Sequence, residues 1–275
     1  MSNSLVSADG KGAKDAPPAI AIGWSERLAP LLPLVGIAAF ILLWALLAAM
    51  PALTAGLLPS PWASIGAVVD GIRGGKLLVD LGSTLYRTLY AFSIAVVLGV
   101  PLGVLLGSKA RLYRACEVLI DFFRSTPATA MFPLFLVIFG LGDFASIAVA
   151  AFAAWLVMLL NSAYGVMQSR EVRRNAAKVM GARGWRMLRD VLLFDAMAQI
   201  FIGLRVAISL ALVVIVVAEM FIGARNGIGK QIIDAQVIYD LPLMYGSILL
   251  SGLMGYALNA LIIFIERRFV HWSGK

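Results

Sequence analysis

The chain has 275 residues, of which 61% are hydrophobic and 14% are charged, and its mean hydropathy is +0.92. A water-soluble globule of this composition would expose most of its apolar surface, so the composition excludes an ordinary soluble domain and predicts that the surplus faces lipid. The formal net charge of +8 does not indicate a nucleic-acid-binding protein, because Lys and Arg lie between apolar segments and not on one amphipathic face.

Residue types that carry chemistry are scarce in this chain. Cys116 and His271 are the single cysteine and histidine, which excludes an internal disulfide and a His/Cys metal cluster. The nearest matches to a phosphate-binding G-x-x-x-x-G-K-[ST] loop, at 75–77 and 229–231, end in Leu and Gln instead of Ser or Thr. The sequence therefore predicts no nucleotide site and no cofactor in this chain, and it offers no catalytic triad or carboxylate pair for an enzyme.

Residues 1–30 contain many small residues, the adjacent prolines Pro17 and Pro18, and two lysines, and they predict a flexible cytosolic tail. The apolar run that follows is too long for the core of a signal peptide, so we expect it to be retained as a span. The runs that match the ~30 Å hydrocarbon core of a bilayer lie at 31–49, 85–106, 118–139, 144–167, 200–222 and 243–265. Because lipid offers no partner for backbone groups, each span should be an α-helix. This predicts an all-α membrane protein with one six-helix transmembrane domain at 31–270 and a short cytosolic end at 271–275.

The basic residues predict how these spans are oriented. The connections at 109–114, 170–189 and 267–275 carry the excess of Lys and Arg that is typical of cytoplasmic loops. Both termini are therefore expected in the cytoplasm. On the opposite side, the segment 59–83 begins with a Pro-Ser-Pro stop and restart signal and predicts an amphipathic helix at the membrane interface.

The connection at 168–199 is about 30 residues long, although a link between two spans needs only a few. Its pattern predicts two short helices, at 172–180 and 184–193, joined at 181–183. Gly181 stands where a helix would end in a left-handed residue, a conformation that Gly adopts without steric cost. We interpret this basic, helical elbow on the cytosolic side as a docking element.

The two most informative stretches of this loop read Asn175-Ala176-Ala177-Lys178-Val179-Met180-Gly181 and Val191-Leu192-Leu193-Phe194. They resemble the signature of binding-protein-dependent ABC transporter permeases, in which Glu-Ala-Ala is followed by Gly and then by an apolar-Leu-Pro ending. The Ala, Gly and apolar positions match. Asn175 stands in place of the acidic residue, and Phe194 stands in place of the proline.

Further stretches extend the resemblance through most of the chain and narrow it to the nitrate, sulfonate and taurine type of permease. In chain order they are Leu58-Pro59-Ser60-Pro61, Gly99-Val100-Pro101-Leu102-Gly103, Arg124-Ser125-Thr126-Pro127-Ala128, Ala218-Glu219 and Gly227-Ile228-Gly229. The resemblance implies the fold of type I ABC importer permeases, a multi-pass location in a bacterial inner membrane, and pairing with a second permease copy as a homodimer. It also implies two cytosolic ATPase subunits that bind ATP and Mg, and an extracytoplasmic binding protein that delivers the solute. The residues that it assigns to ATPase coupling are Asn175, Ala176, Ala177, Gly181 and Arg183.

Glu219 is the strongest candidate for a functional residue within a predicted span, because a carboxylate at mid-bilayer costs ~2.5–3.5 kcal/mol and tends to be functional. It lies about one turn from the outer end of the fifth span, where it could reach water or pair with Arg225. Two interpretations stay open: a residue of the gate or translocation path, and a structural ion pair.

Four other residues are candidates for the translocation path. Arg124 and Arg205 are expected near the cytoplasmic ends of the third and fifth spans, where they either snorkel to the interface or attract an anion. Asn161 either bonds to a neighbouring helix or binds solute. Pro127 is expected to kink or break the third span, as is Pro133, and irregular backbone at membrane depth usually lines a cavity or a helix contact.

These features together predict a permease subunit that forms, with a second copy, a path for a small solute driven by ATP hydrolysis in partner subunits. The resemblance suggests an organic or inorganic anion such as a sulfonate, nitrate or carboxylate. The main alternative is an ATP-independent secondary transporter or channel, but such proteins usually show acids near the midplane or inverted repeats, and neither is evident. A membrane scaffold without solute flux is a third class.

Overall fold

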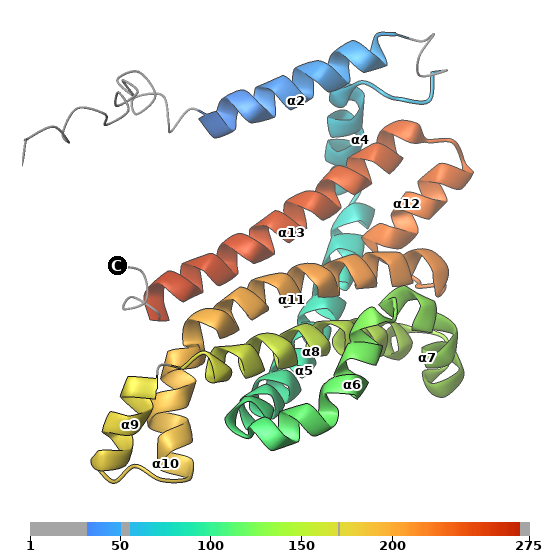
Figure 1. The fold of residues 1–275 in the computed structure, drawn as a ribbon. Helices are drawn as coiled ribbons and strands as arrows, with labels where there is room; N and C mark the ends of the chain where they lie inside the picture. Colours follow the sequence, from blue (N-terminus) through green and yellow to red (C-terminus); the bar gives the residue numbers. More distant parts are fainter. Residues whose placement is uncertain (1–31, 51–55, 170, 270–275) are drawn as a thin grey trace, which may run out of the picture.

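The computed structural model describes residues 32–50, 56–169 and 171–269, and these ranges fold into helices joined by short connections (Figure 1). The expected all-α class is confirmed. The expected tail at 1–30 and the expected end at 271–275 lie outside the described residues.

Four of the described helices are long and apolar enough to cross a bilayer, and a fifth crossing results if one bent helix pair counts as a single span. The four are α5 (Lys76–Ser108), α8 (Asp143–Met167), α11 (Leu193–Phe221) and α13 (Leu241–Phe269). They correspond to the second, fourth, fifth and sixth predicted spans. Helix α5 begins nine residues before the predicted position 85, and one face of these first turns is buried inside the protein through Leu77, Asp80 and Thr84.

The third predicted span, at 118–139, is a broken helix. Helix α6 (Ala110–Ser125) and the segment that ends in α7 (Phe132–Phe139) meet at an angle of 88°. The break falls at Thr126 and Pro127, which have extended ψ angles of 123° and 122°. A proline disfavours helical geometry in the residue before it and donates no backbone bond, so the expected break at Pro127 is confirmed.

Pro133 does not break a helix, because it lies in the first turn of α7, where its missing N–H is not needed. Between the break and α7 the chain forms a single turn of 3-10 helix, η2 (Ala128–Met131). The third predicted span is therefore bent once, at its first proline.

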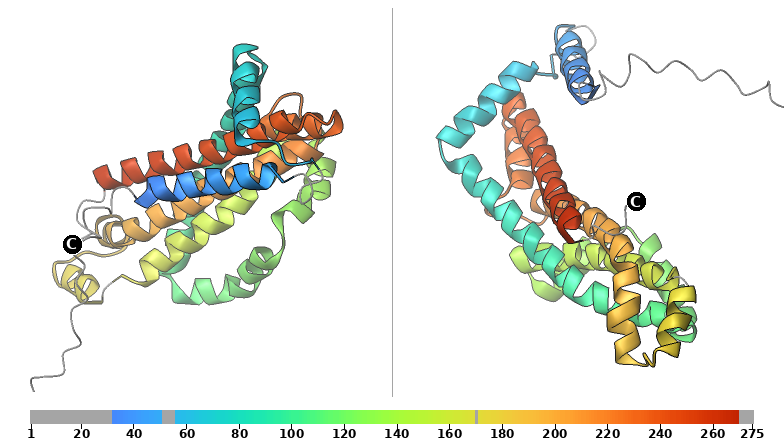
Figure 2. Two further views of the ribbon diagram at one scale, coloured as in Figure 1. Left: turned by 90° about the horizontal axis from the view of Figure 1, so that it is seen from above. Right: turned by 90° about the vertical axis from the view of Figure 1, so that its left-hand side faces the viewer.

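Helix α2 (Leu32–Ala48) corresponds to the first predicted span and, at 17 residues, is shorter than the other apolar helices. None of its residues is buried, and it lies apart from the main bundle in Figure 1 and in the right view of Figure 2. Trp44 connects α2 to the rest of the protein. Its Nε1 donates a 3.0 Å bond to the Pro59 carbonyl, and its ring contacts that of Tyr245.

The expected helix after the Pro-Ser-Pro signal is confirmed as α4 (Pro61–Arg73). Ser60 caps it by accepting a 3.2 Å bond from the Ala63 backbone N–H, and Pro61 occupies its first position. Helix α4 packs against α13, where a Cβ added at Gly246 would come within 2.7 Å of the Ser64 carbonyl oxygen.

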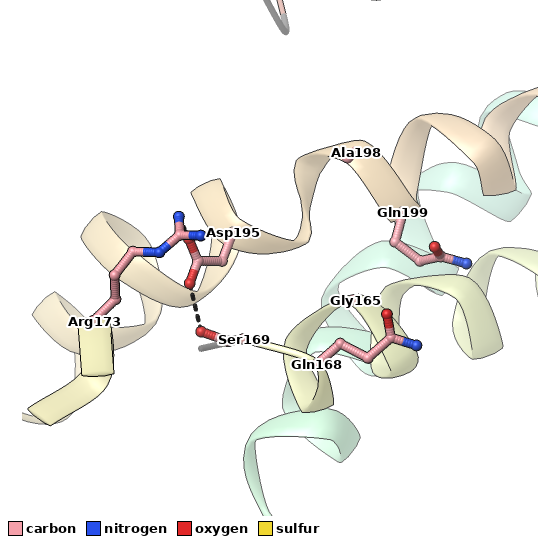
Figure 3. A pocket seen from close by; sticks show the side chains of 7 residues that line it. All are labelled: Gly165, Gln168, Ser169, Arg173, Asp195, Ala198 and Gln199. Carbon is pink, nitrogen blue, oxygen red and sulfur yellow. Dashed lines mark hydrogen bonds and ion pairs between the residues drawn. The ribbon is translucent and has the colours of Figure 1, made fainter. Parts of the chain in front are cut away.

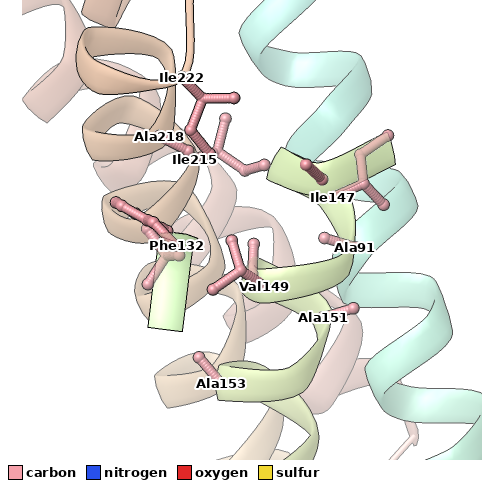
Figure 4. Close-up of a cluster of buried hydrophobic side chains, with 12 residues drawn as sticks. Ala91, Phe132, Ile147, Val149, Ala151, Ala153, Ile215, Ala218 and Ile222 are labelled. Carbon is pink, nitrogen blue, oxygen red and sulfur yellow. The ribbon is translucent and has the colours of Figure 1, made fainter. Parts of the chain in front are cut away.

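Helix α8 forms the centre of the bundle and packs between α5 and α11 (Figure 4). Small residues bring α5 very close to it, since a Cβ at Gly103 would lie 2.3 Å from the Leu159 carbonyl oxygen. Branched side chains fill the remaining space. The buried cluster drawn in Figure 4 includes Ala91 of α5, Phe132 of α7, Val149 of α8, Ile215 of α11 and Ile222, which follows α11.

Candidate functional site

A buried polar network closes one end of the bundle around Glu219. This residue lies in the last turn of α11 and is 1% exposed. Arg87 of α5 donates from Nη1 to Glu219 Oε1 at 2.6 Å, and the Thr84 hydroxyl lies 2.8 Å from Oε2. A buried carboxylate requires this kind of charged and hydrogen-bonded surrounding, because burial without partners is very costly.

The same network holds the start of α12 (Ile228–Val237), the helix in the loop between α11 and α13. The first N–H groups of a helix have no partner within it, and acidic side chains are favourable there. Here three consecutive N–H groups donate to side chains that come from α5 and α11. The bonds are Gly227 N to Asp80 Oδ1 (2.8 Å), Ile228 N to Thr84 Oγ1 (2.9 Å) and Gly229 N to Glu219 Oε2 (3.0 Å).

Glycine is required at both ends of this short Gly-Ile-Gly stretch. Gly227 has a φ of +148°, and a Cβ there would lie 2.3 Å from the Glu219 carboxyl carbon. A Cβ at Gly229 would lie 2.0 Å from the Val216 carbonyl oxygen. The structure therefore explains why the Ala218-Glu219 and Gly227-Ile228-Gly229 stretches occur together, since each packs against the other.

Arg87 extends the network to α8 and to the loop that precedes α12. Its Nε and Nη2 both lie 2.9 Å from Asp143 Oδ1, and Nη1 donates to the Asn226 carbonyl at 2.7 Å. A cavity of about 570 Å³ lies beside these groups and is also lined by Arg225. One guanidinium thus joins α5 to the start of α8 and to the last turn of α11.

This geometry corrects the sequence-based expectation for Glu219. Its ion-pair partner is Arg87 and not Arg225, which is exposed. The contacts match a structural ion pair, and a role in gating stays a prediction. Arg87 was missed, although it carried the same signal as Glu219, a charged residue inside a predicted apolar span.

The elbow at the opposite end of the bundle begins with α9 (Glu171–Val179). Gly181 has a φ of +84°, its N–H donates to the Lys178 carbonyl at 3.0 Å, and the Ala182 N–H donates to the Ala177 carbonyl at 2.9 Å. This pair of bonds is a Schellman motif, which ends a helix through a left-handed residue. The expected conformation of Gly181 is confirmed.

The second short helix expected in the loop is not a separate element. The chain enters α10 (Trp185–Met187), continues through a π-helical turn at Leu188–Leu192, and runs on into α11, so that 185–221 form one continuous helix. The physical reason is the residue at position 194. Phe194 has a backbone N–H and permits helical geometry, whereas a proline there would end the helix.

The alanine pair of the loop faces in two directions. Ala177 is 4% exposed and packs inside the elbow, while Ala176, Asn175 and Arg183 are exposed. Ala177 therefore lies inside the elbow, and its assignment to ATPase coupling stays a prediction. Its small side chain permits α9 to lie close to the π-helical turn, and Ala176 and Asn175 are left to form the outer surface.

A polar cluster ties this elbow to the spanning helices (Figure 3). Asp195, in the first turn of α11, accepts a 2.6 Å bond from the Ser169 hydroxyl at the end of α8 and forms an ion pair with Arg173 of α9. The Asp195 side chain is 7% exposed, and a cavity of about 170 Å³ lies beside the cluster. Sequence reasoning missed Asp195, whose signal was an acid at the start of an apolar helix in a basic loop.

The remaining candidates lie in separate places. Asn161 of α8 accepts a 2.9 Å bond from the Gln199 side chain of α11, which is the geometry of an interhelical bond. Arg205 of α11 pairs with Glu266 of α13 at 3.3 Å. The structure therefore places these two residues at contacts between helices, apart from the network around Glu219.

Arg124 and Pro127 lie at the break between α6 and α7. Arg124 pairs with Asp121 at 3.2 Å, and both side chains are about half exposed. The preceding residue, Phe123, packs against Phe152, which is close to the middle of α8. Helix α6 therefore ends beside the middle of α8 and not beside one of its ends, and the expected place of Arg124 near the cytoplasmic side stays a prediction.

Comparison with known proteins gives a consistent result. A family model described as "Binding-protein-dependent transport system inner membrane component" matches residues 99–273. A probable ABC transporter permease protein of Brucella abortus (strain 2308) is 30% identical over 232 residues, which cover 84% of this chain and 91% of the relative.

Two further relatives carry names that mention solutes. A putative aliphatic sulfonates transport permease protein, SsuC of Bacillus subtilis (strain 168), is 25% identical, with 92% of this chain and 89% of the relative covered. A bicarbonate transport system permease protein, CmpB of Synechococcus elongatus, is 29% identical, with coverage of 89% and 91%.

Among solved structures, the MetNI methionine ABC transporter in an inward-facing conformation matches with a TM-score of 0.63 and 23% identity, covering 70% of this chain and 95% of that chain. An amino acid ABC transporter matches with a TM-score of 0.61 and 19% identity, covering 74% and 98%. These likenesses show the fold, which is that of type I ABC importer permeases.

Proposed function

This chain belongs to the binding-protein-dependent transport system inner membrane components, and we propose that two copies of it enclose the translocation path of an ATP-driven importer. In this proposal the chain itself is not an enzyme. Two cytosolic ATPase subunits bind ATP and Mg and dock on the elbows, and an extracytoplasmic binding protein delivers the solute from the other side of the membrane.

The elbow carries the proposal, because it has an exposed tip and a buried polar connection to a spanning helix. The Schellman motif at Gly181 sets its shape, and the Asp195 cluster holds it against α8 and α11. Val179, Met180 and Trp185 are all exposed by 70% or more, so the tip presents apolar side chains among basic ones. Exposed apolar groups of this kind mark an interaction surface.

The proposed solute is a small organic or inorganic anion. The names of the sulfonate and bicarbonate permeases support this class, since both relatives cover most of this chain. The elbow and both termini lie in the cytoplasm in this proposal, as the distribution of Lys and Arg predicts.

Replacement of Gly181 tests the proposal. In Gly181→Val, a β-branched residue would have to adopt a left-handed conformation, at a local cost on the order of 1–2 kcal/mol. We expect this variant to insert and dimerise but to lose ATPase association and ATP-dependent uptake in vesicles that contain the ATPase and binding-protein partners. Gly66→Ala is a matched control, because Gly66 lies in a helix with no atom near its added Cβ.

Ala176→Trp probes the same surface by a different route, since Ala176 is exposed and its replacement leaves the inside of the elbow intact. Docking through this face predicts that the bulky side chain weakens ATPase association. Normal coupling of ATP hydrolysis to uptake in both Gly181→Val and Ala176→Trp would refute the docking role and favour an ATP-independent carrier.

A further inference from the structure

The end of α6 lies beside the middle of α8, a helix that is long and apolar enough to cross a membrane. Near the start of α6, the Tyr113 ring lies 6.4 Å from that of Tyr164, which is close to the end of α8. At the other end of α6, Phe123 lies 5.5 Å from Phe152. The two helices are therefore antiparallel. Helix α6 ends beside Phe152, which is three positions from the midpoint of α8.

Helix α6 carries a stripe of ionisable side chains on one exposed side. Residues spaced three or four apart share a face of a helix, and the spacing here is three, four and three. A second exposed side holds Leu119 and Phe122, and a third packs on α8 through Tyr113 and Ile120. The members of the stripe are Arg114, Glu117, Asp121 and Arg124, all exposed.

Polar groups also surround the break that follows this stripe. Thr126 and Pro127 have non-helical backbone. Ser125, before them, and Thr129, after them, are both exposed. At membrane depth, non-helical backbone persists only where protein covers it or water reaches it. A charge held against lipid there costs ~2.5–3.5 kcal/mol, and half of a ~30 Å hydrocarbon core is too far for an Arg side chain to snorkel across.

From these contacts we infer that the broken end of α6 lines a water-filled path and that Arg124, Ser125 and Thr129 contact an anionic solute there, near the middle of the membrane. Arg124 has one ion-pair partner, Asp121, while a guanidinium offers five N–H donors, so it retains donors for an oxyanion. The two hydroxyl side chains add donors beside it. The inference rests on the proposed transport function and names the part of the path that would select for anions.

Thiol accessibility tests this inference without requiring the identity of the solute. The variants Ser125→Cys and Thr129→Cys are made in a Cys116→Ala background and placed in vesicles that hold the complete transporter. Each is treated with an anionic methanethiosulfonate (sulfonatoethyl) or a cationic one (trimethylammonioethyl). Leu119→Cys on the apolar side of α6 is the matched control. We expect both test thiols to react at least about tenfold faster than the control, with a preference for the anionic reagent.

The charge of Arg124 should set that preference. Arg124→Gln should lower the ratio of anionic to cationic reaction rates at Ser125→Cys by on the order of tenfold, and Asp121→Asn should raise it, because it removes the one ion-pair partner. The opposite directions separate a local electrostatic effect from a general loss of structure.

Two results would overturn the inference: Ser125 and Thr129 thiols that react no faster than Leu119→Cys, or a rate ratio that neither Arg124→Gln nor Asp121→Asn changes. The proposed transport function is judged separately by ATPase coupling in Gly181→Val. Inert thiols in a transporter that still couples ATP hydrolysis to uptake would reject the path along α6 and leave the permease function standing.

Discussion

At the scale of single residues, the Glu219 and Arg87 pair shows how a membrane protein keeps charges inside its bundle. Glu219 accepts bonds from a guanidinium, a hydroxyl and a backbone N–H, so its burial is compensated on both oxygens. The pair also links further elements, because Arg87 bonds to Asp143 of α8 and Glu219 accepts a bond from Gly229 at the start of α12. Removal of either residue should therefore affect the whole end of the bundle.

We expect Arg87→Ala to destabilise the protein by about 3–5 kcal/mol, since it leaves the Glu219 carboxylate buried without a counter-charge. Glu219→Gln should cost less, because the amide retains the shape of the side chain and part of its hydrogen bonding. Thermal unfolding in detergent measures both. Arg225→Ala is the control, as this exposed residue makes no described bond to Glu219, and a loss of stability equal to that of Arg87→Ala would contradict the assignment.

Glu219 also marks how far a single sequence can predict a site. The cost of a carboxylate in an apolar run identifies Glu219 as a candidate. Its nearest basic residue in the sequence, and so its expected ion-pair partner, is Arg225, six positions along the chain. The actual partner is 132 positions away, and only the packing of α5 on α11 brings it near. Gly181 is the opposite case, because its left-handed conformation depends on local chain geometry alone and could be predicted.

At the scale of elements, the elbow and α11 act as one unit. The helix that leaves the elbow at Trp185 continues without interruption to Phe221, where Glu219 anchors the other end of the bundle. A displacement of the elbow would therefore be transmitted along a continuous helix. Pro127 predicts the break in the third span, whereas the glycines of the loop predict two short helices and give no sign that the second one continues through Phe194 into α11.

The Asp195 cluster should determine how firmly the elbow follows α11. Asp195→Asn removes the charge and should weaken the link to Arg173 by roughly 1.5–3 kcal/mol, the range for hydrogen bonds to charged groups. We expect ATP hydrolysis to persist while the amount of solute taken up per ATP falls several-fold, measured in reconstituted vesicles. Asp190→Asn is the matched control in the same loop, since that carboxylate is 61% exposed. Equal coupling in both variants would show that the cluster does not transmit motion.

At the scale of the whole molecule, two polar clusters, the network around Glu219 and the elbow with its Asp195 cluster, lie at opposite ends of the bundle. The network around Glu219 joins the N-terminal third of α5 and the start of α8 to the last turn of α11. At the elbow, Ser169, which follows α8, bonds to Asp195 in the first turn of α11. The broken helix α6 lies between these ends. The proposed function requires the two ends to lie on opposite sides of the membrane.

The sidedness of the two ends is open to direct labelling. The distribution of Lys and Arg predicts that the elbow is cytosolic and that α12 and the turn after it are external. In a Cys116→Ala background, a membrane-impermeant maleimide should label Tyr239→Cys and Asp234→Cys in intact cells, and Arg174→Cys only after the cells are opened. Tyr239 is 76% exposed, whereas Asp80, on the same side, is buried in the network and is unsuitable as a reporter. Labelling of Arg174→Cys in intact cells would invert the orientation, placing the elbow beyond the reach of a cytosolic ATPase and refuting the ATP-driven function with it.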